Sequence, residues 1–174
     1  GRLFTEFPNK MYKHVEAFVP ALSLDENTVF NKKKNPVHEY CDSIRFLAYK
    51  DNKLVGRIAG IINFKINESL NVNQVRFSRL DMIDDIEVTK ALINQVEKWG
   101  KENKCDTIIG PIGFTDLDRQ GMLIEGFDHL NMFITIYNHA YYMKHMEQLG
   151  FVKDAVWVEK ILYAPNEIPD KVVR

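Results

Sequence analysis

The 174-residue sequence predicts an α/β fold (α+β in some classifications), in which helices flank a central mixed sheet. Two observations support this. Ile44–Lys50 and Lys53–Ile66 are rich in β-branched and aromatic side chains, and Asp51 and Asn52 between them suit a tight hairpin turn. Gln74–Gly113 then follows the order strand, amphipathic helix, strand, which almost always forms a right-handed parallel crossover. A hairpin followed by a crossover places antiparallel and parallel neighbours in one sheet.

Composition narrows the class of protein. Hydrophobic residues make up 45% and charged residues 27%, as in globular domains that bury a sizeable core, so we predict one domain over residues 1–174. A net charge of −1 gives no basic field for nucleic acid or an anionic membrane, and no apolar run reaches the length of a membrane span. With no signal-peptide pattern and two cysteines, a cytoplasmic location is expected. Because the chain opens with glycine, we also expect that it could be part of a longer protein.

The first forty residues are predicted to hold a helix and a long loop. In Phe7–Val19 the apolar residues recur on one side, and Pro20 ends the helix. Ala21–Asp42 is polar, has room for one short helix, and is long enough to lie over a ligand. His38 and Cys41 have the spacing of metal ligands but lack a second pair, so no metal site is predicted.

The second hairpin strand is expected to be central in the sheet. In the middle of Lys53–Ile66 both alternating sets of side chains are apolar, which is typical of a strand covered on both faces. Arg57 interrupts one set, and a buried guanidinium needs either a carboxylate of the protein or a ligand as partner. Asn67–Asn73 is then predicted as the loop that leads into the strand Gln74–Met82.

The crossover helix is predicted to begin after Asp84. Asp84 and Glu87 have capping-box spacing, and Asp106–Pro111 after the helix has the composition of a short buried strand. The free N–H groups of such a helix start lie at the carboxyl end of a strand, where α/β sheets bind ligands. The apolar stripe of the helix recurs at intervals of three and four residues: Val88, Ala91, Leu92, Val96 and Trp99.

Ile112–Tyr137 combines dense polar residues with frequent glycines and is predicted to be a shaped loop. Glu125, Asp128 and His129 lie close together in it. A carboxylate beside an imidazole could act as a general base with its orienting partner, or bind an amine, and the alternative is hydrogen bonding within the loop. Three further residues are expected to form an ion pair inside the loop or to contact a ligand: Asp116, Asp118 and Arg119.

A last helix and strand are predicted at the end of the chain. Asn138 is placed to cap a helix, Gly150 to end it, and Phe151–Tyr163 to form a strand or hairpin. The tyrosines at the start of this helix are expected to line the core or a groove, with one of them as an alternative proton donor: Tyr137, Tyr141 and Tyr142.

This pattern resembles the GNAT N-acetyltransferase superfamily and, in detail, a bacterial group of GNAT-like proteins of uncharacterised activity. The resemblance extends from about Phe4 to Tyr163 and implies a splayed, mixed central sheet flanked by helices. Asn138-x-Ala140 with Leu149-Gly150-Phe151 is similar to the last conserved block of the superfamily. Shorter matching segments are Asn35-Pro36, Phe46–Tyr49, Val55–Ala59, Gly110-Pro111, Gly121–Asp128 and Tyr137–Tyr142.

The resemblance implies direct transfer of an acetyl or longer acyl group from acyl-CoA to a small amine, by a cytoplasmic enzyme that could be a homo-oligomer. Glu125, Asp128 and His129 would serve as base and its partners, and Tyr142 as the acid that protonates the leaving thiolate. A backbone amide would polarise the thioester carbonyl. The implied acyl-CoA site comprises the start of the crossover helix and two residues of the last block: Met82, Ile83, Asp84, Asp85, Ile86, Asn138 and Tyr141.

An alternative is a GNAT-fold binding or assembly domain with a degenerate cofactor loop and no catalysis. The superfamily usually carries a Gln/Arg-x-x-Gly-x-Gly/Ala loop, whereas Met82–Glu87 contains neither glycine nor arginine. Its three carboxylates suit a helix dipole but repel a pyrophosphate. Met146 also stands where the superfamily usually has its acid tyrosine, four residues before the Gly-Phe pair.

Overall fold

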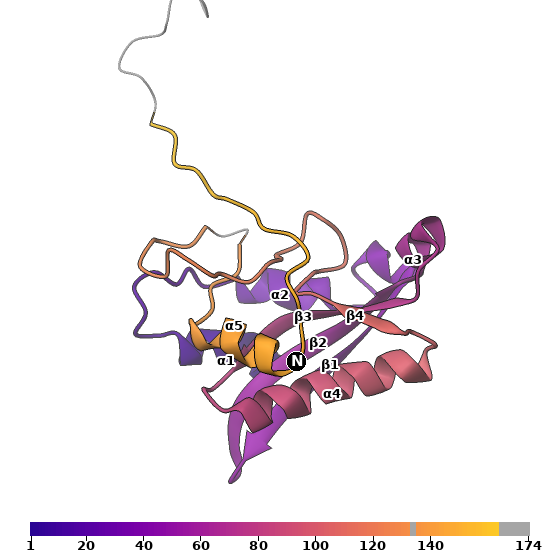
Figure 1. Ribbon diagram of the computed structural model, residues 1–174, viewed down its shortest axis with the longest axis horizontal. Coiled ribbons are helices and arrows are strands. Elements are labelled where there is room, and N and C mark those ends of the chain that lie inside the picture. The colour runs from indigo at the N-terminus through magenta and orange to yellow at the C-terminus, as the bar shows by residue number, and fades with distance from the viewer. Residues whose placement is uncertain (133–134, 164–174) are drawn as a thin grey trace, which may run out of the picture.

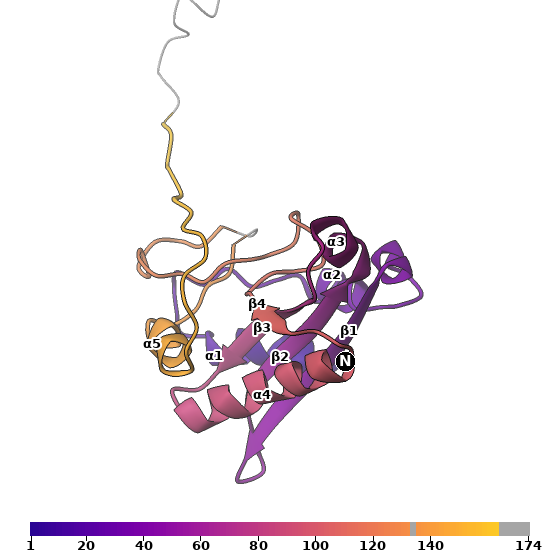
Figure 2. The same cartoon turned by 45° about the vertical axis from the view of Figure 1, so that its right-hand side comes forward.

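The computed structural model describes residues 1–132 and 135–163, and its centre is a four-stranded mixed sheet. One long helix, α4, covers one face of the sheet, and α1 and α2 lie on the other (Figure 1, Figure 2). The predicted α/β class with a mixed sheet flanked by helices is therefore confirmed. In spatial order the strands are β1 (Cys41–Lys50), β2 (Lys53–Asn63), β3 (Gln74–Met82) and β4 (Thr107–Ile109). The helices are α1 (Arg2–Met11), α2 (Ser23–Val29), a 3-10 turn (Pro36–Glu39), α3 (Phe64–Leu70), α4 (Ile86–Glu102) and α5 (Tyr141–Gln148).

The β1–β2 hairpin forms as predicted. Lys50 pairs with Lys53 across the two-residue turn, in which Asp51 and Asn52 have φ angles of 50° and 59°. Asp and Asn tolerate positive φ better than most residues, and such a turn matches the twist of the strands that it joins. Strand β2 pairs with β1 on one edge and β3 on the other and is buried from Val55 onward, so it is the central strand that the sequence predicts.

Helix α4 packs closely on β2 because two glycines face it. A Cβ atom at Gly60 would lie 2.9 Å from Trp99 Cε3, and one at Gly56 would lie 2.8 Å from Leu92 Cδ1. The predicted apolar stripe of α4 therefore reaches the strand backbone itself. The core on this face is formed mainly by buried residues of β2, β3, α4 and α5, among them Ile58, Phe77, Met82, Leu92 and Val96.

Helix α1 begins at Arg2 and ends at Met11, so the predicted helix Phe7–Val19 was wrong at both ends. Phe4 and Phe7 are buried on the side of α1 that meets the sheet, while Pro8 lies inside the helix. Burial of two aromatic rings outweighs the one backbone hydrogen bond that a proline removes. Helix α2 is the short helix that the sequence allows within the predicted loop Ala21–Asp42.

Strand β2 ends at Asn63, before the predicted end at Ile66. The Asn63 side chain accepts a hydrogen bond from Ile66 N at 3.0 Å and so caps helix α3, which occupies most of the segment predicted as a loop. The cap of α4 is Asp85 instead of Asp84, because the Asp85 carboxylate accepts from Glu87 N at 3.0 Å. A side-chain acceptor at a helix start satisfies N–H groups that the helix cannot.

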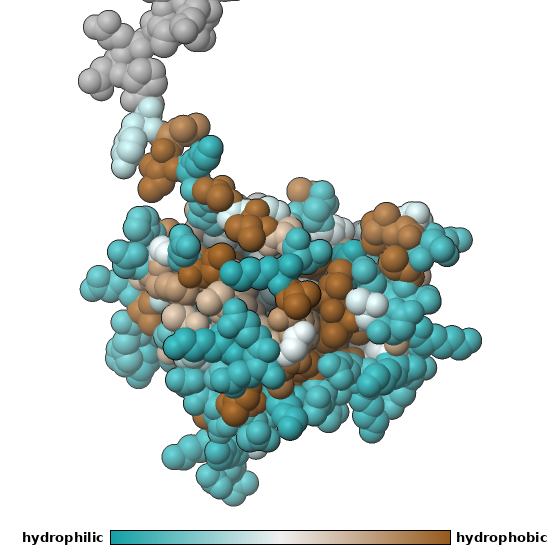
Figure 3. Space-filling model, in the orientation of Figure 1, coloured by the Kyte–Doolittle hydropathy of each residue, from teal (hydrophilic) through white to brown (hydrophobic). Residues whose placement is uncertain are grey.

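Phe151–Tyr163 forms no strand, contrary to the prediction. Phe151 still packs against Phe77, but from Val152 onward the segment leads away from the sheet (Figure 1) and its large apolar side chains are exposed, Trp157 at 64% and Leu162 at 89%. No described strand lies beside it, so its backbone has no ladder partner. Figure 3 shows hydrophobic residues along this extended segment and a mostly hydrophilic surface over α4. Among residues 1–132 and 135–163, none of the helices combines the length and hydrophobicity needed to cross a bilayer.

Strands β3 and β4 run parallel, as predicted, but pair over only three residues. Their register joins Gln74 to Thr107, Val75 to Ile108 and Arg76 to Ile109. Beyond this point β3 continues to Met82, whereas the chain after β4 turns away, with one hydrogen bond from Ile112 N to Phe77 O at 2.9 Å. The sheet is therefore splayed at this edge. We call residues 77–82, which β4 does not pair, the open edge of β3.

One extra residue in β3 changes which side chains face each side of the sheet. Arg57 of β2 pairs with Asp81, but Ala59 pairs with Ser78, so a bulge lies between them. Arg79 in this bulge has a φ angle of 51°. Simple alternation from Phe77 would direct Arg79 and Asp81 toward α4, and the bulge turns both to the opposite face.

We predict that Gly60→Ala lowers the free energy of unfolding by about 1–3 kcal/mol, because the added methyl group meets the rigid Trp99 ring. Urea denaturation would measure the loss. Lys53→Ala, at an exposed position of the same strand, is the control and should change stability little. In Gly60→Ala/Trp99→Leu the ring is absent, so a double variant whose loss equals the sum of the single losses would contradict this packing account.

Candidate functional site

In the described structure, Leu80 at the open edge of β3 has no register partner on β2 or β4. Tyr141 donates its hydroxyl to Met82 O at 2.6 Å, and Met82 N donates to the Tyr142 hydroxyl at 3.1 Å. Met82 thus directs both backbone groups away from β2, and alternation along the strand directs those of Leu80 the same way. Within the described residues, no loop or side chain forms a hydrogen bond with the Leu80 backbone. The Leu80 N–H group can therefore donate to a ligand at this edge.

Acidic side chains surround the start of α4 and already form contacts within the protein. Asp85 Oδ2 accepts from Lys50 Nζ at 2.7 Å, and this contact holds the pKa of Asp85 below its usual range. Asp84 Oδ1 lies 3.2 Å from His145 Nε2 on α5. The predicted cofactor residues from Met82 to Ile86 therefore lie together at one end of the open edge. Negative charge there suits the helix dipole but not a second anion.

A buried polar cluster lies on the other face of the sheet. Arg57 Nε donates to Asp81 Oδ2 at 2.7 Å, so its partner is a carboxylate of the protein, one of the two partners considered for it. The Tyr12 hydroxyl donates to Asp81 Oδ1 at 3.2 Å and lies 2.7 Å from the Tyr142 hydroxyl. Burial raises the pKa of Asp81 despite the guanidinium beside it, and burial also raises the pKa of Tyr142 well above its usual value.

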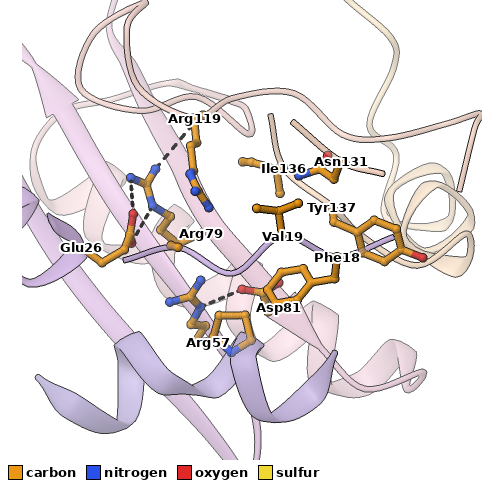
Figure 4. A pocket seen from close by; sticks show the side chains of 12 residues that line it. Phe18, Val19, Glu26, Arg57, Arg79, Asp81, Arg119, Asn131, Ile136 and Tyr137 are labelled. Carbon is orange, nitrogen blue, oxygen red and sulfur yellow. Dashed lines mark hydrogen bonds and ion pairs between the residues drawn. The ribbon is translucent and has the colours of Figure 1, made fainter. Parts of the chain in front are cut away.

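A second buried ion pair lies beside the first. Both carboxylate oxygens of Glu26 on α2 accept from Arg79, each at 3.1 Å. Burial acts to raise the pKa of Glu26, but the charge and hydrogen bonds of Arg79 outweigh it, and that pKa is lowered. Next to the two pairs is a cavity of about 40 Å³, roofed by the loop that carries Arg119 and Ile136 (Figure 4).

The predicted catalytic loop residues lie apart from this cavity. Asp128 and His129 contact each other at 3.0 Å, and both side chains are largely exposed. Glu125 is exposed as well. The Asp128 pKa is lowered, first by the hydrogen bond from His129. None of the three lines the cavity or contacts Tyr142 within the described residues, so their assignment as base and partners stays a prediction.

Two other expectations for this region were wrong. Asn138 caps no helix; α5 begins after Ala140, and the Asn138 amide instead accepts from Leu123 N at 2.7 Å and donates to Leu123 O at 3.0 Å. It therefore fixes the loop in place. Asp118 binds the backbone N–H groups of Phe114 and Thr115 instead of Arg119, so the expected ion pair inside the loop does not form in the described structure.

Most of the polar cluster was not predicted from the sequence. Tyr12 and Asp81 had no role in it, and Glu26 and Arg79 were not singled out. A signal for Asp81 was present, because the apolar positions of β3 shift from odd (Val75 and Phe77) to even numbers (Leu80 and Met82). Such a shift within one strand indicates a bulge. No comparable signal connects Glu26 to Arg79, which are 53 residues apart.

Among known proteins, no protein-family model matches the chain. It is 29% identical over 163 residues to protein YghO of Escherichia coli K12, and 22% identical over 152 residues to the bacterial ceramide synthase of Caulobacter vibrioides. These alignments include 91% and 86% of the chain but 42% and 39% of the relatives, so the chain spans about two fifths of either protein.

Two solved structures have a similar fold over most of their length. One is a predicted acetyltransferase from Clostridium acetobutylicum solved with acetyl-CoA, with a TM-score of 0.53 and 12% identity, covering 92% of this chain and 88% of that one. The other is a proposed acetyl transferase from Pyrococcus furiosus, with a TM-score of 0.50 and 14% identity, covering 91% of both chains. The chain therefore has the GNAT-like fold.

We predict that Arg57→Met lowers the free energy of unfolding by about 3–5 kcal/mol at neutral pH, because it leaves the Asp81 carboxylate buried and uncompensated. The loss should shrink as the pH falls through the raised pKa of Asp81, since the carboxyl group then becomes neutral in the folded protein. Urea denaturation at neutral and mildly acidic pH would measure both effects. In Arg57→Met/Asp81→Asn neither charge of this ion pair remains, so the double variant should recover stability and lose the pH dependence. A loss of stability in Arg57→Met that does not change with pH would contradict the account.

Proposed function

We propose that the chain is an acyl-CoA-dependent N-acyltransferase domain that transfers an acyl group directly to a small amine. The observation that carries this proposal is the position of Leu80, which lies in the bulge of β3 and has no register partner on β2 or β4 in the described structure. The same fold occurs in a predicted acetyltransferase solved with acetyl-CoA. A backbone N–H fixed at such an edge can stabilise the negative charge that develops on a carbonyl oxygen during attack.

Each step of the transfer has a candidate group in this chain. Acetyl-CoA or a longer acyl-CoA would supply the activated acyl group as a thioester. Leu80 N–H would donate to its carbonyl oxygen, and Tyr142 would donate a proton to the leaving sulfur. Tyr141 holds the strand edge beside it through Met82 O. Glu125, Asp128 and His129 are the proposed source of the base that accepts the amine proton.

The two faces of the sheet suggest how the two substrates approach. The thioester would lie along the open edge next to α5, with its phosphates near Ile86 at the start of α4 and Asn138 supporting the adjacent loop. The amine would enter from the cavity beside Arg79, which is next to Leu80 in the bulge. A ceramide contains an amide bond, so the name of the Caulobacter relative supports amide formation as the reaction class.

A second candidate function is a binding or assembly domain that performs no chemistry. The acidic start of α4 favours it, because Asp84, Asp85 and Glu87 occupy the position where a pyrophosphate would need free N–H groups. Asp85 already accepts the N–H of Glu87, so fewer donors remain for a phosphate. The distinction between the two functions is therefore whether CoA binds.

We expect isothermal titration calorimetry to detect CoA binding, and Asp85→Asn to tighten it about two- to fivefold, because asparagine keeps the helix cap and removes one charge near the phosphates. Glu97→Gln, on the later turns of the same helix, is the matched control and should leave the affinity unchanged. No heat at millimolar CoA would reject the enzyme and favour the binding domain. An unchanged affinity in Asp85→Asn would reject the placement of the phosphates.

We expect Tyr142→Phe to lower the rate of thiol release from acetyl-CoA in the presence of a panel of small amines by about 10²–10⁴-fold, because the proton donor for the thiolate is lost. The affinity for CoA should change little. Tyr141→Phe removes a neighbouring hydroxyl that donates to Met82 O at the same edge, and we expect a much smaller loss of rate. Equal losses in both variants would show that Tyr142 is not the acid.

A further inference from the structure

Among the described residues, Arg119 is the guanidinium lining the cavity that forms no ion pair. Its side chain extends into the space between Arg79 and Ile136 (Figure 4). Its backbone carbonyl accepts a hydrogen bond from Arg79 Nη1 at 3.5 Å. Within residues 1–132 and 135–163, no carboxylate forms an ion pair with its guanidinium and no acceptor forms a hydrogen bond with it.

Each oxygen of the nearby carboxylates already accepts a hydrogen bond from another side chain. Both oxygens of Glu26 accept from Arg79, and the two oxygens of Asp81 accept from Arg57 and Tyr12. The cluster of these side chains with Arg119 therefore has three guanidinium groups and two carboxylates, an excess of one positive charge. Burial lowers the pKa of Arg119, with Glu26 acting against this and the guanidinium groups of Arg79 and Arg57 adding to it.

A partly buried excess charge is costly unless an anion approaches it. A guanidinium presents its donors in a planar fork, which fits a carboxylate or a phosphate with two parallel hydrogen bonds. The cavity of about 40 Å³ is small, so it suits an anionic group and not a whole substrate. Phe18, Val19 and Ile136 form an apolar wall along which the rest of a ligand could lie.

We propose that Arg119 binds an anionic group of the acceptor, and that the acceptor is therefore an acidic amine, carrying a carboxylate or a phosphate together with its amino group. This rests on the proposed function, since it names the class of amine that the transferase would accept. Arg119 and Arg79 lie on the face of β3 opposite the α4 core. An anion held there would direct its amino group toward the bulge, where Leu80 N–H would hold the thioester carbonyl.

The test is calorimetry on the full 174-residue chain without acyl-CoA, using two matched pairs of probes. Leucine is compared with 3-methylbutylamine, which lacks only the carboxylate, and phosphoethanolamine with ethanolamine, which lacks the phosphate. We expect one acidic member to bind about 10- to 100-fold more tightly than its partner, as a charged hydrogen-bonded contact provides. Preference for leucine would identify a carboxylate as the group, and preference for phosphoethanolamine a phosphate.

Three variants separate ligand binding from a structural role of Arg119. Arg119→Gln should abolish the preference for the acidic probe, whereas Arg119→Lys should retain part of it, because charge remains but the fork is lost. Lys101→Gln removes an exposed cation on α4, beyond the other face of the sheet, and should have no effect. Thermal unfolding of each variant is measured in parallel. A large drop in melting temperature for Arg119→Gln with binding preserved would show a structural role and overturn the proposal.

Absence of any preference for the acidic probes in the unmodified chain would also overturn it. Failure of the proposed function has a different signature. If CoA does not bind but acidic amines still do, and do so through Arg119, the anion subsite stands and the transferase is rejected. If CoA binds and both amine pairs bind equally, the transferase stands and the acidic acceptor is rejected.

Discussion

The bulge in β3 is the constraint on which the arrangement of both faces depends. One inserted residue lets Leu80 and Met82 join the core under α4 while Arg79 and Asp81 enter the polar cluster on the opposite side. Without it, two charged side chains would be directed into an apolar core, which is costly for unpaired charge. The same insertion lies where β4 has left the sheet, so the irregular part of the strand is also its open part.

Charge is distributed unequally across the two faces that meet at this strand. The start of α4 gathers Asp84, Asp85 and Glu87, whereas the cavity side has more guanidinium groups than carboxylates. A net charge of −1 for the whole chain conceals this separation. A ligand that is anionic at one end and carries an amine at the other would therefore meet opposite fields on the two sides of the sheet.

The local parts of the fold could be predicted from the sequence, and the long-range contacts could not. The hairpin turn at Asp51 and Asn52 and the periodicity of α4 are properties of neighbouring residues. The partners of Arg57 and Arg79 are 24 and 53 residues away, and the sequence contains no rule that would select them. Phe151–Tyr163 has a strand-like composition, but pairing also needs an available edge, which composition does not specify. The region of the open edge could be predicted from the sequence, but the hydrogen bonds of the Tyr141 and Tyr142 hydroxyl groups with the Met82 backbone could not.

The contact between Tyr12 and Tyr142 has a consequence for the direction in which protons are shared. When Asp81 is ionised and accepts from Tyr12, the Tyr142 hydroxyl can donate to Tyr12 or to Met82 O, which lies 3.5 Å away, while it accepts from Met82 N–H. When Tyr142 donates to Tyr12, the two hydroxyl groups form a chain of hydrogen bonds, all donated in the same direction, from the edge of β3 to Asp81. A protonated Asp81 could instead donate to Tyr12, and the hydrogen bonds of this chain could then be donated in the opposite direction. The ionisation of one buried carboxyl therefore bears on the orientation of a hydroxyl that lies on the other side of the sheet.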